Sequence, residues 1–231
     1  MASFDEGISQ TLSVLRRKGP LTRAEIVADS GLSRSAINLR LEALAEVDLV
    51  RGVTGEVATK GRPADLFAFN PARGKLLAAD IGATKMRVGL CDLAGAIELE
   101  EPLLVDVASG PEPVLAMVLE SFERLLEKSG TPREQVLGIG ISLPAPVKSS
   151  AGMTVSPPII PRWNRFDVPA WLAPHFACPV FLEKDANAMA YGEARAVFPD
   201  TVVPRDFDAI EVPFPERGDP VLVKPELEQP A

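Results

Sequence analysis

Residues 61–85, GRPADLFAFNPARGKLLAADIGATK, constrain the fold of this chain more than any other stretch. A Gly-Arg-Pro tip precedes a short strand-like run at 66–69, which is typical of a hairpin loop that probes a groove. An apolar run at 76–81 then leads into Gly82-Ala83-Thr84, and a second apolar run follows at 86–93. Small residues in such a turn let backbone amides approach an anion. The stretch therefore predicts two different structural units that meet near residue 70.

Three short helices are predicted before this stretch. The first covers 4–18 and ends at Gly19-Pro20. Thr22 and Glu25 have the spacing of a capping box that starts the second helix. Ser33 is the predicted N-cap of the third helix. On the first and third helices, apolar residues recur at spacings of three and four: Ile8, Leu12, Leu15, Ile37, Leu41 and Leu44.

The second and third helices, joined through a glycine turn, have the pattern of a helix-turn-helix. In that motif the early residues of the second helix enter the major groove of DNA. Arg34 and Asn38 are the candidates for base edges, because guanidinium and amide groups form paired hydrogen bonds with guanine and adenine. Ser33 and Ser35 are better suited to phosphates, and Arg40 completes the candidate set. The alternative is a pair of short amphipathic helices with no role in DNA binding.

A β-wing is predicted after these helices. Strand-like runs at 49–51 and 66–69 flank a loop rich in Gly, Thr and Lys. Arg62 is placed to enter a minor groove, where a narrow width favours arginine. The alternative for Arg62 is a solvated loop charge. Together these patterns predict a winged helix-turn-helix DNA-binding domain over residues 1–70.

Charge and composition restrict the class of protein. The net charge is −8, yet residues 1–75 carry eleven Lys or Arg against nine Asp or Glu. A mildly basic head on an acidic body is compatible with DNA contact through the head. No apolar run approaches the roughly 18–20 residues that span a membrane, the start MASFDEGISQ lacks a secretory signal pattern, and the two cysteines match no metal-ligand spacing. We therefore expect a cytoplasmic protein with no membrane association.

The turn after the run at 76–81 carries candidate phosphate ligands. Gly82 offers a backbone amide, Thr84 a hydroxyl and Lys85 a cation within reach of a phosphate. Asp80, at the strand end, is a candidate for holding a hydrated magnesium ion. The alternative is a tight β-turn with a solvated Lys85.

From residue 112 onward, strands and helices alternate, as in an α/β fold. A helix is predicted over 112–128, strands over 136–142 and 179–182, a short helix around Trp171, and a last helix over 188–197.

A polar cluster follows the predicted strand at 179–182. Asp185 is suited to accept a proton from a sugar hydroxyl as a general base, and Asn187 to bind further hydroxyls. The alternative is that Asp185 only caps the helix that follows.

In this order the motifs resemble the ROK family of repressors, uncharacterised reading frames and sugar kinases, in particular its branch with an N-terminal winged helix-turn-helix. The resemblance covers residues from about 8 to 197. Its segments are GRPADLFAFNP (61–71), DIGATKMRVGLCDLAG (80–95), GIGISLPAPV (138–147), Trp163-Asn164 and PVFLEKDANAMAYGE (179–193). It implies an α/β fold in which a winged helix-turn-helix precedes an actin-like (ribonuclease-H-like) sugar-kinase lobe.

The resemblance also implies roles for single residues. Residues 80–85 match the first phosphate loop, and Asp185 matches the catalytic base of kinase members. Asn187 and Glu193 belong to the same sugar motif. Two residues depart from the family pattern: Ala83 stands where kinases have glycine and crowds a phosphate, and Lys184 replaces an asparagine. We therefore expect the phosphate loop and the base to be vestigial.

The last part of the chain does not resemble the family. No second phosphate loop, adenosine pocket or His- and Cys-rich zinc motif follows residue 198, and we expect His175 to be a surface residue rather than a metal ligand. Residues 199–231 contain seven prolines and eight acidic residues. We expect an incomplete lobe over 74–198, truncated after its first half, and a poorly ordered tail over 199–231 with one strand near 206–212.

These patterns predict a DNA-binding transcriptional regulator, a repressor of sugar metabolism or transport. The expected partners are a double-stranded DNA operator, a sugar effector and a second copy of the chain. No cofactor, metal ion or enzymatic activity is expected. The alternatives are a sugar kinase for a hexose or N-acetylhexosamine and a fragment without function.

Overall fold

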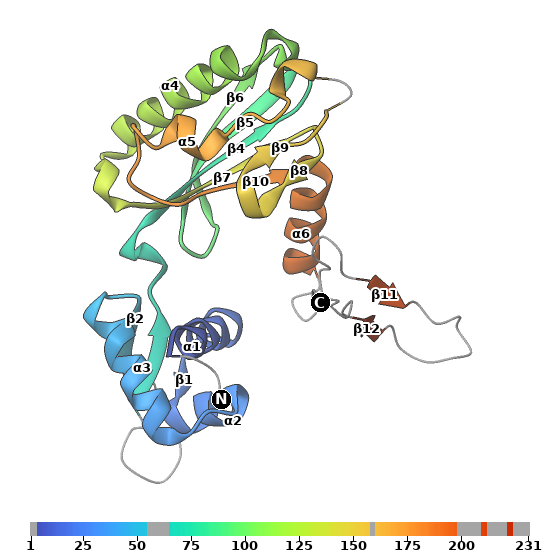
Figure 1. The fold of residues 1–231 in the computed structure, drawn as a ribbon. Coiled ribbons are helices and arrows are strands. Elements are labelled where there is room, and N and C mark those ends of the chain that lie inside the picture. The colour runs from blue at the N-terminus through green and yellow to red at the C-terminus, as the bar shows by residue number, and fades with distance from the viewer. Residues whose placement is uncertain (1–3, 55–64, 158–159, 198–208, 212–220, 224–231) are drawn as a thin grey trace. The chain divides into compact units, whose positions relative to one another are not determined.

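The computed structural model describes residues 4–54, 65–157, 160–197, 209–211 and 221–223. The chain divides into two compact units, residues 1–185 and 186–231, and each is described by itself. Figure 1 shows the order of the elements along the chain.

Three helices form the start of the first unit: α1 (Phe4–Lys18), α2 (Arg23–Ser30) and α3 (Arg34–Glu46). Both predicted caps are confirmed. Thr22 and Glu25 form a reciprocal capping box, and the backbone N–H of Thr22 holds the pKa of the Glu25 carboxyl below its ordinary value. The Ser33 hydroxyl accepts a hydrogen bond from the backbone N–H of Ala36. Gly31, with a φ of 67°, ends α2 in the left-handed region that favours glycine.

A three-stranded antiparallel sheet packs with these helices. Its strands β1 (Leu21–Thr22), β2 (Val50–Thr54) and β3 (Asp65–Phe69) lie in the order β1-β3-β2. The predicted strands near 49–51 and 66–69 are confirmed as β2 and β3, whereas β1 was not predicted. Residues 55–64, which include the predicted contact Arg62, lie outside the described part of the chain.

The helices and this sheet share one apolar core. Its buried residues are Leu15, Ile26, Ile37, Leu41, Leu44 and Val50, and Ile8 and Leu12 pack against them partly buried. The predicted apolar stripes of α1 and α3 therefore face each other. This burial is the main source of stability for helices this short.

A five-stranded mixed sheet forms the larger part of the first unit, in the order β10-β7-β4-β5-β6. The strands are β4 (Lys75–Ile81), β5 (Lys85–Asp92), β6 (Ile97–Leu104), β7 (Val136–Leu143) and β10 (Val180–Lys184). β4, β5 and β6 are antiparallel neighbours, whereas β4, β7 and β10 are parallel. Every predicted strand is present, and β6 was not predicted.

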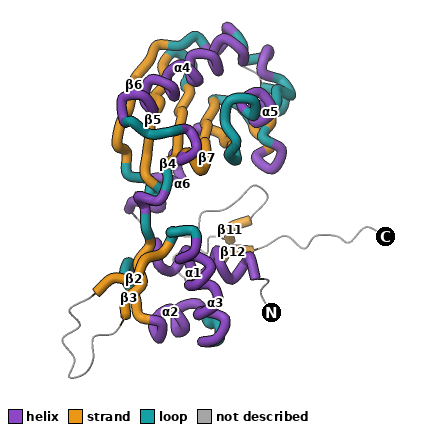
Figure 2. Tube along the Cα trace, turned by 90° about the vertical axis from the view of Figure 1, so that its left-hand side faces the viewer, coloured by secondary structure: helices purple, strands orange, loops and turns teal. Residues whose placement is uncertain are grey.

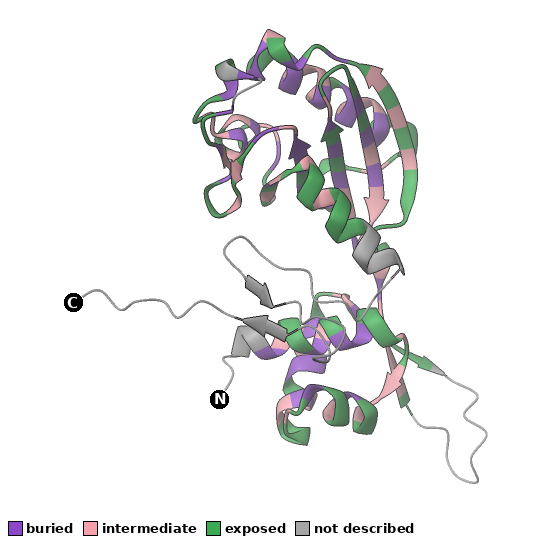
Figure 3. Ribbon diagram, turned by 90° about the vertical axis from the view of Figure 1, so that its right-hand side faces the viewer, coloured by how far each residue is buried: buried purple, intermediate pink, exposed green. Residues whose placement is uncertain are grey.

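One face of this sheet is buried. α4 (Pro111–Ser129), which confirms the predicted helix, lies along β5 and β6 (Figure 2). α5 (Val168–Leu172) contacts β10. Alternate residues of β4 and β5 are buried, and their neighbours are exposed or half-buried (Figure 3). The second face of the sheet carries exposed small or polar residues, such as Ala78, Asp80 and Gly140, together with Phe181 of β10, which is 66% exposed.

Short elements connect the main ones. β8 (Val147–Lys148) and β9 (Met153–Thr154) form a small hairpin, and the 3₁₀ turns are η1 (Pro71–Arg73), η2 (Val107–Ser109), η3 (Arg133–Gln135), η4 (Ser149–Ala151) and η5 (Pro161–Trp163). Trp163 is fully buried, and its Nε1 donates to the carbonyl oxygen of Val107 at 2.9 Å. The indole thus connects η5 to η2.

The connection between the two sheets is fixed by hydrogen bonds. The Nδ2 of Asn70, a side chain only 4% exposed, donates to the carbonyl oxygen of Asp48 at 2.8 Å. The Nε of Arg73 donates to the carbonyl oxygen of Val47 at 2.7 Å. On the other side, the N–H of Leu93 donates to the carbonyl oxygen of Pro71 at 3.1 Å. The turn η1 is therefore anchored both to the end of α3 and to the end of β5.

The second unit contains α6 (Asp185–Val197) and an antiparallel pair, β11 (Ala209–Glu211) with β12 (Val221–Val223). The helix begins three residues earlier than predicted. β11 falls within the strand expected near 206–212, and β12 was not predicted. Among the described residues, no helix is both long and apolar enough to cross a bilayer.

Candidate nucleic-acid interface and ligand site

The outer face of α3 is exposed at its N-terminal end. Arg34 and Ser35, both predicted DNA contacts, are exposed. The Ser33 hydroxyl caps the helix and lies 3.1 Å from the Ser35 hydroxyl. This part of α3 presents a cation, two hydroxyls and the positive end of the helix dipole, all of which are suited to an anionic partner.

Asn38 lies at the side of this face and is half-buried. Its Oδ1 is buried and accepts no hydrogen bond in the described structure. Asn38 therefore lies one turn after Arg34 along α3, and its Oδ1 has no hydrogen-bond donor among the described residues.

Arg40 was predicted to contact DNA, but the structure buries it, leaving the residue only 7% exposed. Its Nη1 donates to the carbonyl oxygen of Ala36 at 3.0 Å. The guanidinium also lies against Gly7 of α1, where an added Cβ would come within 1.9 Å of the Arg40 Nε. Arg40 is part of the packing between α1 and α3, so it does not share the exposed face of Arg34 and Ser35.

Sequence reasoning missed a basic residue at the start of α2. The guanidinium of Arg23 lies over the Phe67 ring, 4.5 Å from its centroid, and its Nη1 is 3.6 Å from an Asp65 carboxylate oxygen. Both partners belong to β3. The stacking holds the cation at the N-terminus of α2 while leaving it partly exposed.

Further basic residues gather at the end of α1, in the run Arg16-Arg17-Lys18. Arg16 lies over the Phe69 ring at 5.5 Å, and Lys18 pairs with Asp29 at 2.7 Å. The three consecutive basic residues were the sequence signal from which this cluster could have been predicted.

The predicted phosphate loop is a tight hairpin turn between β4 and β5. The N–H of Gly82 donates to the carbonyl oxygen of Lys85 at 2.9 Å. The carbonyl oxygens of Ala83 and Thr84 accept hydrogen bonds from Val107 and Val105. The amide of Gly82 is therefore occupied in closing the turn, whereas Thr84 and Lys85 are exposed at its tip.

The ends of three parallel strands meet beside this turn. Asp80 of β4 is paired in register with Ser142 of β7, which is paired with Glu183 of β10. The buried Ser142 hydroxyl donates to the Asp80 carboxylate. Glu183 accepts a hydrogen bond from the Ser149 hydroxyl at 2.8 Å. Sequence reasoning missed Ser142 as a partner of Asp80.

The predicted sugar residues follow the last of these strands. Asp185 is the first residue of α6 and is half-buried, and Asn187 is exposed. The side chain of Glu193 lies outside the described part of the structure. Because parallel strands end at the same edge of a sheet, β10 delivers Asp185 to the edge where Asp80 ends β4.

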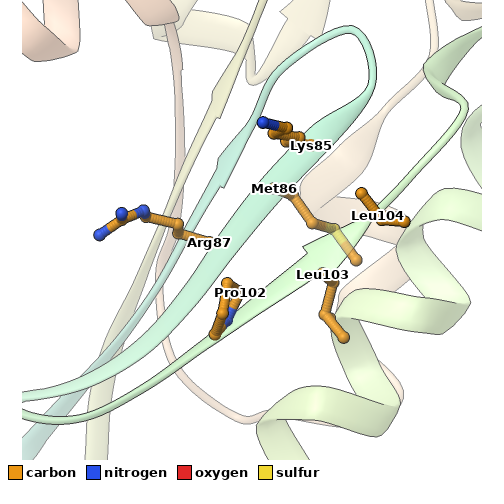
Figure 4. A pocket seen from close by; sticks show the side chains of 6 residues that line it. All are labelled: Lys85, Met86, Arg87, Pro102, Leu103 and Leu104. Carbon is orange, nitrogen blue, oxygen red and sulfur yellow. The ribbon is translucent and has the colours of Figure 1, made fainter.

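A hollow of about 350 Å³ lies on the other side of the turn, between β5 and β6 (Figure 4). It is lined by Lys85, Met86, Arg87, Pro102, Leu103 and Leu104. Of the predicted site residues, only Lys85 takes part in it. The hollow therefore does not coincide with the predicted sugar residues.

No group of three or more metal-ligating side chains occurs within the described ranges. His175, predicted to be a surface residue, is half-buried beside Trp171, with ring centroids 5.7 Å apart.

The chain is 25% identical over 193 residues to the xylose repressor of Bacillus spizizenii, which covers 83% of this chain and 50% of that protein. It is 32% identical over 119 residues to the glucokinase of Thermotoga maritima, which covers 52% of this chain and 36% of that enzyme. The chain spans about half the length of the curated repressors it matches.

The fold agrees with that of a solved regulator. The crystal structure of a ROK family transcriptional regulator, a homologue of the E. coli MLC protein, superimposes with a TM-score of 0.69 at 21% identity. The match covers 90% of this chain and 52% of that one. The sequence profile of the ROK family matches residues 76–198, and the chain belongs to the ROK family.

Proposed function

We propose that the chain acts as a DNA-binding transcriptional regulator of genes for sugar metabolism or transport, in the manner of a repressor. The observation that carries the proposal is the N-terminal end of α3, where Arg34 and Ser35 are exposed and Ser35 lies on the side of the helix away from the buried Ile37 and Leu41. A helix that presents its early polar residues in this way fits the recognition helix of a helix-turn-helix.

In this proposal residues 1–70 form a winged helix-turn-helix. The strands β2 and β3 are the arms of the wing, and Arg62 is the proposed minor-groove contact. Arg34 and Asn38 read base edges, and Ser33 and Ser35 contact phosphates. Arg40 is left out, because it lies against Gly7. Arg23, at the start of α2, is added as a phosphate contact, because the first helix of the motif crosses the DNA backbone.

Residues 74–198 form, in the same proposal, the N-terminal lobe of an actin-like sugar-kinase fold. Asp185, Asn187 and Glu193 contact a sugar effector, and two copies of the chain bind a pseudo-palindromic operator. The name of the Bacillus relative makes xylose the first sugar to test. A sugar can shift such a dimer only through different affinities for its DNA-bound and free forms.

The proposal is tested by selecting duplexes from a random-sequence pool with the full chain at low salt. An enriched duplex is then measured by fluorescence anisotropy over a range of salt concentrations. We expect specific binding that weakens steeply with salt, and an Arg34→Ala variant that binds the selected duplex about tenfold more weakly or worse. Failure to enrich any duplex would contradict the proposal.

A sugar kinase is the second candidate, favoured by the similarity to the Thermotoga glucokinase. Two features oppose it in our proposal: the Gly82 amide closes the turn, and the methyl group of Ala83 stands at its tip. We therefore infer that the turn at residues 80–85 and the base Asp185 are vestigial. A coupled assay for sugar-dependent ADP formation with xylose, glucose and N-acetylmannosamine separates the two candidates.

A further inference from the structure

Leu39 is an exposed apolar side chain in the middle of the outer face of α3. It is 58% exposed, the highest value among the large hydrophobic residues described in the helix–sheet region at residues 4–69. Successive residues of a helix are about 100° apart. Leu39 is two residues from both Ile37 and Leu41, which are buried in the core, so it points away from them. Packing within the chain therefore does not account for a leucine here.

The neighbours of Leu39 on this face are polar. Ser35 precedes it by four residues and Glu42 follows it by three, which are the spacings of one helix face. Both are exposed. Arg34 and Asn38 lie beside this face. Leu39 is thus an apolar group among side chains that carry hydrogen-bonding groups.

Charge indicates which end of this face meets DNA. The N-terminal part carries Ser35 and lies next to Arg34 and the Ser33 cap, whereas the C-terminal part carries Glu42 and Glu46. Phosphates repel the second part and are attracted to the first. Docking by the N-terminal part brings Leu39, about one turn beyond Ser35 on the same face, into the groove.

The major groove offers one methyl group, the C5-methyl of thymine, and the other groups by which the bases are distinguished there are hydrogen-bond donors and acceptors. We propose that Leu39 selects thymine in the operator by contact with that methyl group. The inference rests on the proposed function and adds a base preference to it. A leucine can make this contact without giving up a hydrogen-bonding group of its own.

The test uses the duplex selected by the full chain and versions of it in which single thymidines are replaced by deoxyuridine. This replacement removes the methyl group and keeps the pairing. At one or more positions we expect the wild-type chain to bind the deoxyuridine duplex about fourfold more weakly, the factor that burial of one methyl group provides.

Variants assign the preference to Leu39. Leu39→Ala should bind both duplexes equally, whereas Leu39→Met, which keeps an apolar side chain, should keep a preference for thymidine. Val47→Ala, a truncation of another exposed apolar side chain at the end of α3, is the matched control and should behave as the wild type. Because both sites are exposed, circular dichroism should show unchanged folding.

The outcomes distinguish the two proposals. If no duplex is enriched, both the function and the thymine contact are overturned. If the wild type binds its duplex but tolerates deoxyuridine at every position, only the thymine contact is overturned. The same holds if Leu39→Ala keeps the full thymidine preference.

Discussion

Arg73 donates a hydrogen bond from its Nε to the carbonyl oxygen of Val47, 2.7 Å away, at the residue that caps the C-terminal end of α3. Asn70 donates to the next carbonyl, that of Asp48. The last carbonyl groups of a helix lack partners within the helix. Two side chains from the start of the large sheet region thus complete the end of the proposed recognition helix.

Loss of the Asn70 donor should weaken this end of α3. Asn70→Asp keeps the size of the side chain but places an acceptor next to the Asp48 carbonyl oxygen. We expect the free energy of unfolding to fall by roughly 1–3 kcal/mol, since a buried group loses its partner. Urea unfolding monitored by circular dichroism measures the change. The exposed Ala72→Ser, in the same turn, is the control; an equal loss in both variants would contradict the role of the hydrogen bond.

A side chain at Gly7 should displace the Arg40 guanidinium. An added Cβ would lie 1.9 Å from the Arg40 Nε, so Gly7→Ala must displace the guanidinium and break its hydrogen bond to Ala36. We expect a net loss of stability of up to about 1 kcal/mol, because the clash and the lost hydrogen bond cost roughly 1–3 kcal/mol while alanine gains up to about 1 kcal/mol over glycine within a helix.

The double variant Gly7→Ala/Arg40→Ala tests this cause. The stability that the double variant loses should be smaller than the sum of the two single losses, since the clash disappears with the guanidinium. Ser9→Ala, an exposed site on the same helix, is the matched control. Strictly additive losses would argue against direct contact.

Arg23 should contribute to DNA affinity without sequence preference. Removing one phosphate contact lowers the slope of log K against log salt by about 0.9. We expect Arg23→Ala to show this change and to weaken binding to selected and unrelated duplexes by a similar factor. Arg23→Lys should restore most of the slope. Arg87→Ala, on the large sheet, is the control and should leave the slope unchanged.

Glu101 should make stability depend on pH in the acid range. The Ser121 hydroxyl, at 2.6 Å, and the Arg124 guanidinium hold the pKa of this carboxyl below its ordinary value of about 4.3. A lowered pKa means that the folded state binds the proton less well than the unfolded state. The contribution is therefore complete above about pH 4.3 and is lost as the pH falls through the folded-state pKa.

Glu101→Gln tests this dependence. The difference in free energy of unfolding between wild type and variant should be largest near neutral pH and should shrink on acidification. Ser121→Ala removes the largest cause of the lowered Glu101 pKa, so the free energy of unfolding of this variant should depend less on pH than that of the wild type. A difference that stays constant from pH 3 to 7 would contradict the assignment.

Local patterns predicted the parts of the fold that depend on neighbours in sequence. Thr22 and Ser33 cap α2 and α3 because their hydroxyls meet amides two or three residues on. The strands β4, β5 and β7 follow from apolar runs. By contrast, β6, IELEEPLL, contains a proline and three glutamates, which disfavour strands, and only its pairing with β5 makes it one.

The candidate sites depended more on tertiary contacts. Arg40 has the residue type and the spacing of a DNA contact, and the missing side chain at Gly7 is what lets α1 cover it. Nothing in the sequence of α3 indicates that α1 leaves room for this guanidinium at Gly7. Ser142 was likewise missed, because its partner Asp80 is distant in sequence and becomes its neighbour only through the register of β4 and β7.

The contacts that complete α3 also differ in how they respond to sequence change. Their acceptors are the main-chain oxygens of Val47 and Asp48, which every residue type carries. Their donors are the side chains of Asn70 and Arg73, which few residue types can replace. Homologues are therefore free to vary at position 47 without losing this connection, whereas Asp48 is restricted by its left-handed backbone and its pair with Arg51, and one substitution at position 70 or 73 removes half of the connection. Mutational scanning should therefore find that substitutions are tolerated at the acceptor Val47 but not at the donors Asn70 and Arg73, which lie about 25 residues further along the chain.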